Sequence, residues 1–204
     1  MAEPCRICHT RRPKRYCSGI AGDICSRCCG DQREVNISCP LDCQYLQEAH
    51  RHERPSELNY DDLPNKDIRV NEDFLDDHKD LALFCLSAVA DAGLRTPGAV
   101  DFDILSAVDA LIRTYRTADS GLIYETRPED KIAAAVQDQI TRSLTDFQKE
   151  RAPFRNADVM RCLVFVQRYA LMQHNGRPRG RAFIDFVQRA DMPKLQGMSA
   201  AAGA

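Results

Sequence analysis

Eight cysteines fall within the first 43 residues of this 204-residue chain, and they constrain its fold more than any other feature. Eight thiolates are the number that two tetrahedral, all-cysteine zinc sites require. A Cys-x2-Cys pair suits such a site because its tight turn aims both sulfurs at one point, about 2.3 Å from each. The spacing therefore predicts a small module that binds two structural Zn²⁺ ions. Its predicted ligands are Cys5, Cys8, Cys17, Cys25, Cys28, Cys29, Cys39 and Cys43.

These cysteines group into short-range pairs, of which Cys5/Cys8 and Cys25/Cys28 have the x2 spacing and Cys39/Cys43 are one helical turn apart. Keeping the pairs intact gives one ion to Cys5, Cys8, Cys25 and Cys28, and the other to Cys17, Cys29, Cys39 and Cys43. The two sets interleave along the chain, which is a cross-braced topology. Exchanging Cys28 and Cys29 is an equally legal assignment, and His50 or His52 could replace a thiolate.

The rest of the chain predicts a cytoplasmic protein with no membrane segment. Residues 1–16 contain no apolar stretch typical of a secretory signal, and the longest nearly apolar run, Leu81–Ala90, is too short to span a bilayer. Thiols stay reduced in the cytosol, so a disulfide scaffold is disfavoured. An iron–sulfur cluster remains the alternative cofactor, although eight ligands in a small module favour zinc.

The cysteine-rich head resembles treble-clef and cross-brace zinc modules of the RING, B-box and MYND kind. That resemblance implies a knuckle, a hairpin and a helix-borne pair around the metals. The adjacent Cys28 and Cys29 and the nine residues before Cys39 depart from those families, so a RING-like ligase role is not implied. The run from Cys25 to Gly30, followed by Cys39 to Leu46, is similar to the head of uncharacterised bacterial proteins, to which no activity is attached.

Downstream, the hydrophobic pattern changes to a helical period, which predicts a mostly α chain. We expect a zinc module over 1–54 ending in a helix, an acidic linker over 55–71, a four- to five-helix bundle over 72–191 and a disordered tail over 192–204. Within the head, Glu34–Ser38 alternates like one short strand. Helices are expected from about Asn71 to Gly93, from Asp101 through Tyr115, from Pro128 through Phe147, from Asn156 to about Asn175 and over 181–189.

Arginines concentrate at the two ends of the chain. Those in the head offset the charge of zinc-bound thiolates or form a surface for phosphate or an acidic partner. Near the C-terminus, Arg177, Arg179 and Arg181 lie in a Gly-Arg-Pro segment similar to AT-hooks, which favours either nucleic-acid contact or a plain loop between helices. Residues 120–128 are unusually apolar for a loop, which indicates packing over the bundle or binding of a partner.

Two further groups have structural interpretations. The acidic residues and histidine between Asp73 and Asp80 match the dipole of a helix start. Cys85 and Cys162 lie on apolar stripes and are expected in the core.

No common catalytic motif occurs in the sequence, and a site closed by four thiolates leaves no position for a substrate. We therefore predict a non-catalytic zinc-binding protein that acts as an adaptor or regulator through a macromolecular partner, a protein in preference to nucleic acid. Nucleic-acid binding through the head and the Gly176–Arg181 loop is the second hypothesis. An iron–sulfur redox or sensor protein is the third.

Overall fold

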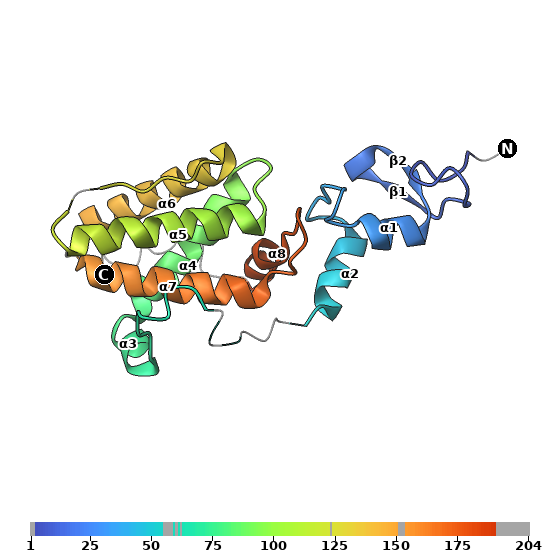
Figure 1. Cartoon of the computed structure of the whole chain (residues 1–204). Helices are drawn as coiled ribbons and strands as arrows, with labels where there is room; N and C mark the ends of the chain where they lie inside the picture. Colours follow the sequence, from blue (N-terminus) through green and yellow to red (C-terminus); the bar gives the residue numbers. More distant parts are fainter. Residues whose placement is uncertain are drawn as a thin grey trace.

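The computed structural model describes residues 3–54, 59, 61, 63–122, 124–150 and 154–190. The chain is mostly helical, with a cysteine-rich head at the N-terminus followed by a helical bundle (Figure 1). The predicted fold class is confirmed. Part of the expected linker (55–58, 60 and 62) and the expected tail (192–204) lie outside the described residues. None of the helices in the described part of the chain is both long enough and apolar enough to cross a bilayer.

Among the described residues, the head combines a two-stranded hairpin, whose connection includes a 3-10 turn at Ser18–Ile20, with two short α-helices. Strand β1 (Arg15–Cys17) pairs antiparallel with β2 (Gly22–Ile24), and the helices are α1 (Ser26–Gln32) and α2 (Gln44–His52). The strand expected over Glu34–Ser38 is wrong, because only an isolated bridge joins Arg33 and Ile37. Glu34 has a φ of 54°, a left-handed conformation that interrupts extended backbone.

In the part of the chain that the structure describes, six α-helices follow the head. Their bounds are α3 (Glu72–Asp77), α4 (Lys79–Arg95), α5 (Asp101–Asp119), α6 (Lys131–Glu150), α7 (Asn156–Gln173) and α8 (Ala182–Arg189). The four long helices α4 to α7 pack side by side, and α8 lies at the end of the bundle that faces the head (Figure 1).

The helix expected from Asn71 to Gly93 begins where predicted but differs in its middle and at its C-terminal end. It is divided at His78, which has non-helical backbone angles, and it continues past Gly93 to Arg95. Gly93 is a packing residue and not a stop signal. A Cβ atom there would lie 2.6 Å from Cδ1 of Ile104, so the glycine allows α4 to approach α5 closely.

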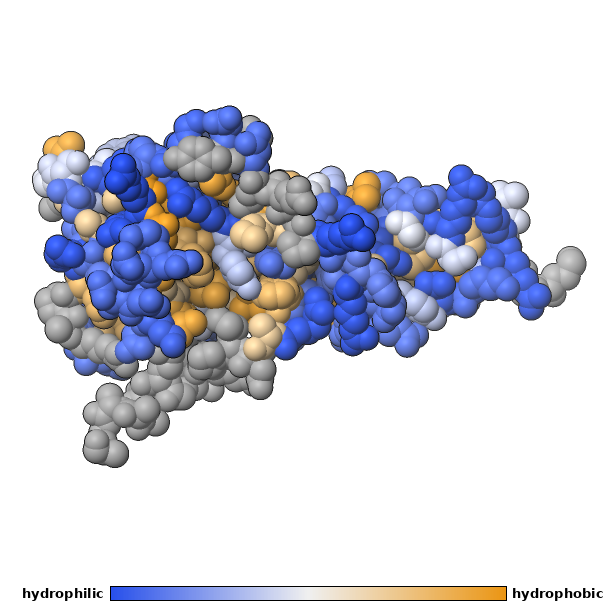
Figure 2. Space-filling view, turned by 90° about the horizontal axis from the view of Figure 1, so that it is seen from below, coloured by the Kyte–Doolittle hydropathy of each residue, from blue (hydrophilic) through white to orange (hydrophobic). Residues whose placement is uncertain are grey.

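One apolar core joins the bundle helices. Fully buried side chains such as Val89, Ile104, Ile140 and Leu163 come from four helices and contact one another. Cys85 and Cys162 are also fully buried in this core, and their thiols form a hydrogen bond between α4 and α7. Their expected core position is confirmed. The surface of the head is mostly hydrophilic on the face in Figure 2, whereas hydrophobic residues reach the surface of the bundle.

Candidate metal centre

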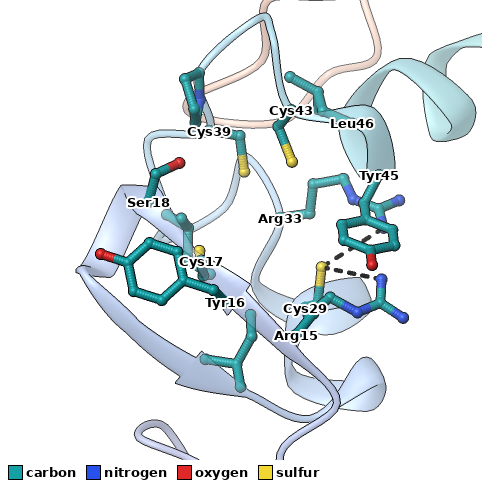
Figure 3. A pocket seen from close by; sticks show the side chains of 13 residues that line it. Arg15, Tyr16, Cys17, Ser18, Cys29, Arg33, Cys39, Cys43, Tyr45 and Leu46 are labelled. Atoms are coloured by element: carbon teal, nitrogen blue, oxygen red, sulfur yellow. Dashed lines mark hydrogen bonds between the residues drawn. The ribbon is translucent and has the colours of Figure 1, made fainter.

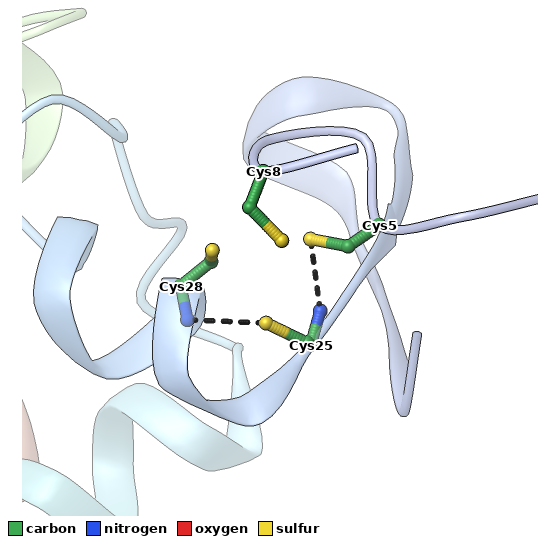
Figure 4. Close-up of side chains that lie close together, drawn as sticks. All are labelled: Cys5, Cys8, Cys25 and Cys28. Atoms are coloured by element: carbon green, nitrogen blue, oxygen red, sulfur yellow. Dashed lines mark hydrogen bonds between the residues drawn. The ribbon is translucent and has the colours of Figure 1, made fainter. Parts of the chain in front are cut away.

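Four cysteines from two segments of the head form a compact cluster. The sulfurs of Cys5, Cys8, Cys25 and Cys28 all lie within 4.8 Å of one another, and no other group of three or more possible metal ligands does so among the described residues. Figure 4 shows the Cys5/Cys8 turn facing the first turn of α1. Tetrahedral zinc needs sulfurs about 3.8 Å apart, which follows from the Zn–S distance. This cluster could therefore bind a metal ion such as zinc with little rearrangement.

Local backbone structure places each of these thiols. Cys25 is the N-cap of α1, and its sulfur accepts the N–H of Cys28 at 3.5 Å. The N–H of Cys25 in turn donates to the sulfur of Cys5 at 3.2 Å. The Cys5/Cys8 turn closes at His9, whose φ is 52° and whose N–H donates to the carbonyl of Cys5 at 2.8 Å. The Cys5/Cys8 turn, the β1–β2 hairpin and the start of α1 thus converge on one point.

The surroundings of this cluster shift the pKa values of Cys5 and Cys28 in opposite directions, and a bound cation would favour the ionised form of all four thiols. Burial opposes ionisation of Cys5, but N–H donors from Cys8, Cys25 and Ile7 lower its pKa to about 6. Burial and the neighbouring thiols raise the pKa of Cys28 to about 12. The four thiols cannot all ionise together without a compensating charge, and a divalent ion supplies that charge. Arg11 contributes part of it, because its guanidinium bonds to Cys25, which raises the pKa of Arg11.

The other four predicted ligands line a second pocket on the bundle side of the first cluster. Cys17 ends β1, Cys29 lies in α1, Cys39 precedes α2 in a loop, and Cys43 is the N-cap of α2. The pocket volume is about 20 Å³, enough for one ion or water molecule. Figure 3 shows these four side chains around the pocket. Their sulfurs do not all lie within 4.8 Å of one another, so this set is more open than the first.

Two arginines of the head face this second set. Nη1 of Arg15 lies 3.9 Å from the sulfur of Cys29, and Nη2 of Arg33 lies 3.8 Å from it (Figure 3). Arg15 also lies over the ring of Tyr45, 3.8 Å from its centroid. At least three arginines of the head therefore face cysteine sulfur, which fits the offset of thiolate charge that the sequence suggested.

Neither histidine of α2 belongs to a cysteine cluster. The ring nitrogens of His50 lie 2.7 Å from Asp185 Oδ2 and 3.0 Å from Glu34 Oε2, while His52 bonds to Glu48 on the surface. His50 and both of its carboxylate partners are almost fully buried. This charged cluster joins head to bundle. Sequence reasoning missed it because Glu34, His50 and Asp185 are far apart in the chain and share no spacing.

The three arginines of the Gly176–Arg181 segment lie where the bundle meets the head. Arg177 pairs with Glu53 at 3.1 Å, Arg179 donates to the hydroxyl of Ser38, 2.6 Å away, and Arg181 is half-buried. Burial lowers the pKa of Arg181. The contacts of Arg177 and Arg179 are with residues of the head.

The apolar loop over 120–128 is held on the bundle by hydrogen bonds along its length. Thr117 of α5 accepts the N–H of Leu122 at 3.0 Å and donates to the carbonyl of Tyr124 at 3.1 Å. Thr126 donates its N–H to Thr114, and its carbonyl accepts from Gln137. Leu122 and Tyr124, by contrast, are 65% and 67% exposed. Ile123 lies outside the described residues. Tyr124 lines an open cleft of about 520 Å³ whose other walls are Pro64, Asn65, Asp109, Arg113, Arg116, Thr117 and Thr126.

Comparison of the chain with protein-family models, with curated proteins and with solved structures finds no match.

Proposed function

We propose that this chain is a non-catalytic zinc-binding protein that holds two structural Zn²⁺ ions and acts as a protein–protein interaction adaptor or regulator. The convergence of Cys5, Cys8, Cys25 and Cys28 carries the proposal. A site with four cysteine ligands is closed, because zinc of this kind has four ligands and no position remains for a substrate. Such an ion contributes folding free energy, and the function then belongs to the surfaces around it.

Ligand chemistry favours zinc for both ions. Tetrahedral sulfur sites select zinc or iron–sulfur centres, and a small module with two sets of four cysteines suits two single ions better than a cluster. The order of turn, hairpin and helix around the first cluster supports a treble-clef arrangement. All ten cysteines are free thiols in the described structure and so remain open to metal binding. Metal analysis of protein purified without added metal tests the assignment. Visible absorbance with bound iron would instead support an iron–sulfur protein.

The cleft beside Tyr124 is the surface that we propose for a protein partner. Exposed aromatic and aliphatic side chains beside arginines are typical of protein interfaces. Here Tyr124 lines the cleft and Leu122, two residues before it, is equally exposed, while Arg113 and Arg116 line the cleft and supply the charges.

Capture of partners from native lysate tests this surface with the full chain as bait. We expect Leu122→Ser with Tyr124→Ser to lose a specific partner while the zinc content stays the same. Leu94→Ser with Met172→Ser provides the matched control, because both side chains are exposed (39% each) and neither lines the cleft. Equal capture by the double variant and the wild type would contradict this assignment.

Nucleic-acid binding is the second proposal for the chain. It predicts an affinity for duplex DNA or RNA that falls steeply with salt and weakens when Arg177, Arg179 and Arg181 are replaced by glutamine. If those substitutions leave the affinity unchanged, the loop has no such role.

A further inference from the structure

Glu34 connects the second cysteine set directly to the bundle. Its main-chain N–H donates to the sulfur of Cys39. Its carbonyl accepts the N–H of Arg179 at 2.8 Å, and its side chain accepts the N–H of Arg181 at 2.8 Å and the amide of Asn175 at 2.8 Å. Glu34 is fully buried although it is charged, and its left-handed φ persists only where the surroundings fix it.

Helix α2 makes the second connection between these cysteines and the bundle. Cys43 is its N-cap, so a metal bond to this thiol would hold the start of the helix. Two turns later His50 reaches Asp185 of α8, at 2.7 Å. Just beyond the helix, Glu53 pairs with Arg177 at 3.1 Å. Cys39 and Cys43 therefore belong to the two segments of the head that contact the bundle.

An ion in the second pocket would join these two segments to the rest of the head. Cys17 and Cys29 belong to the hairpin and to α1, whereas Cys39 and Cys43 belong to the loop and to the start of α2. Four bonds from one ion would fix the loop, α1 and α2 relative to one another. The first cluster makes no such link, because its four ligands all precede Glu34.

We infer that a thiophilic divalent ion bound by Cys17, Cys29, Cys39 and Cys43 holds the head on the bundle, and that its loss releases the Gly176–Arg181 loop. The inference rests on the second zinc ion of the proposed function. It gives the two ions different roles. The first stabilises the far end of the head, and the second controls whether Arg177 and Arg179 stay engaged with Glu53 and Ser38.

Residue-resolved amide hydrogen exchange on the full chain tests this inference. The amides of Arg179 and Arg181 both donate to Glu34 of the head, while those of Phe183 and Ile184 donate to Asp101 of the bundle. In Cys39→Ser with Cys43→Ser, we expect the first two amides to exchange at least about tenfold faster. The amides of Phe183 and Ile184 should keep their rates within about twofold, because their acceptor lies outside the head.

Cys5→Ser with Cys8→Ser is the matched control, since it removes the same number of thiols from the first cluster. We expect it to leave the exchange of Arg179 and Arg181 near the wild-type rates. Equal acceleration in both double variants would overturn the inference, because the head would then detach as one unit whichever ion is lost. Stepwise removal of zinc from the wild-type protein by a chelator repeats the test without any substitution.

Native mass spectrometry of the same samples separates the inference from the proposed function. If the wild-type chain never holds a second ion, the second site fails and the inference fails with it. If two ions bind, and loss of the second leaves Arg179 and Arg181 protected, only the inference is overturned.

Discussion

Nδ1 of His50 lies 2.7 Å from Oδ2 of Asp185, across the boundary between the cysteine-rich head and the helical bundle. On its other side, Nε2 of His50 lies 3.0 Å from Glu34. A histidine between two buried carboxylates can bond to both as a donor only when it is protonated. The contact therefore joins the two parts of the chain through a buried charge, and its removal should be costly.

Replacing His50 with alanine should lower the free energy of unfolding by about 3 kcal/mol, because it leaves two buried carboxylates without their shared partner. Urea denaturation measures this loss. His52→Ala is the matched control, since His52 lies on the same helix with its side chain 78% exposed. The control should change stability by less than about 0.5 kcal/mol. Similar effects of the two substitutions would contradict a buried ionic contact at His50.

The same contact predicts a pH dependence. Burial opposes the charged form of His50, but its bonds to Asp185 and Glu34 outweigh burial and raise its pKa to about 9. The folded pKa is therefore higher than the unfolded value, which is about 6.5. The contribution of His50 to stability is complete below about pH 6.5 and disappears as the pH rises through about 9.

A comparison of wild type with His50→Gln tests that dependence. The difference in unfolding free energy between the two proteins should shrink between pH 6.5 and pH 9.5. Other groups near the contact, including Asp101, Arg177 and Arg189, are present in both proteins. Metal binding by thiols strengthens with pH and cannot cause such a loss. A constant difference across this range would show that His50 is neutral in the folded protein.

Asp101 caps α8 from a different helix, and its removal should destabilise that helix. Its carboxylate accepts the N–H groups of Phe183 at 3.0 Å and Ile184 at 3.3 Å. Loss of a helix cap costs about 1–2 kcal/mol. We therefore expect Asp101→Ala to lower the unfolding free energy by that amount in urea denaturation. Asp146→Ala, which removes a carboxylate that is 69% exposed, should have almost no effect. A neutral Asp101→Ala would refute the capping role.

Much of this fold follows from the sequence. The apolar stripe through Ile132, Val136 and Ile140 has the period of one helix face, and α6 has the position that this stripe indicates. The grouping of Cys5, Cys8, Cys25 and Cys28 follows similarly from two tight turns of known geometry. In both cases neighbours in the sequence determine the structure.

The rest depends on contacts between distant parts of the chain. The sequence places Asp101 at the start of its own helix, but its carboxylate caps α8, because the two helix starts meet in the folded bundle. The spacing of Cys39 and Cys43 suits one helical turn, but Cys39 lies in a loop, since α2 begins only after Cys43. No local pattern in the sequence indicates that Glu34 and His50 meet Asp185.

Gly19 offers a test of the second cysteine set that changes no thiol. A Cβ atom at this position would lie 2.8 Å from the carbonyl oxygen of Ser38, the residue before Cys39. Gly19→Ala should push this backbone away from Cys17 and weaken the binding of the second ion by about tenfold or more in a chelator competition, because metal ligands must be positioned within a few tenths of an ångström.

Gly30→Ala is the matched control for that experiment. Gly30 lies in α1 with no atom within 4 Å of the added Cβ, so alanine should keep the metal affinity and stabilise the helix by about 0.5–1 kcal/mol. Unchanged zinc affinity in Gly19→Ala would mean that the approach of Ser38 to the hairpin does not position Cys39.

The metal content of the purified chain tests the central claim most directly. The protein should be expressed without added metal, then measured by elemental analysis together with native mass spectrometry. We predict two zinc ions per chain and no iron, with one zinc ion remaining after Cys5→Ser with Cys8→Ser. A folded head that carries no metal, or one that carries iron with visible absorbance, would contradict the account.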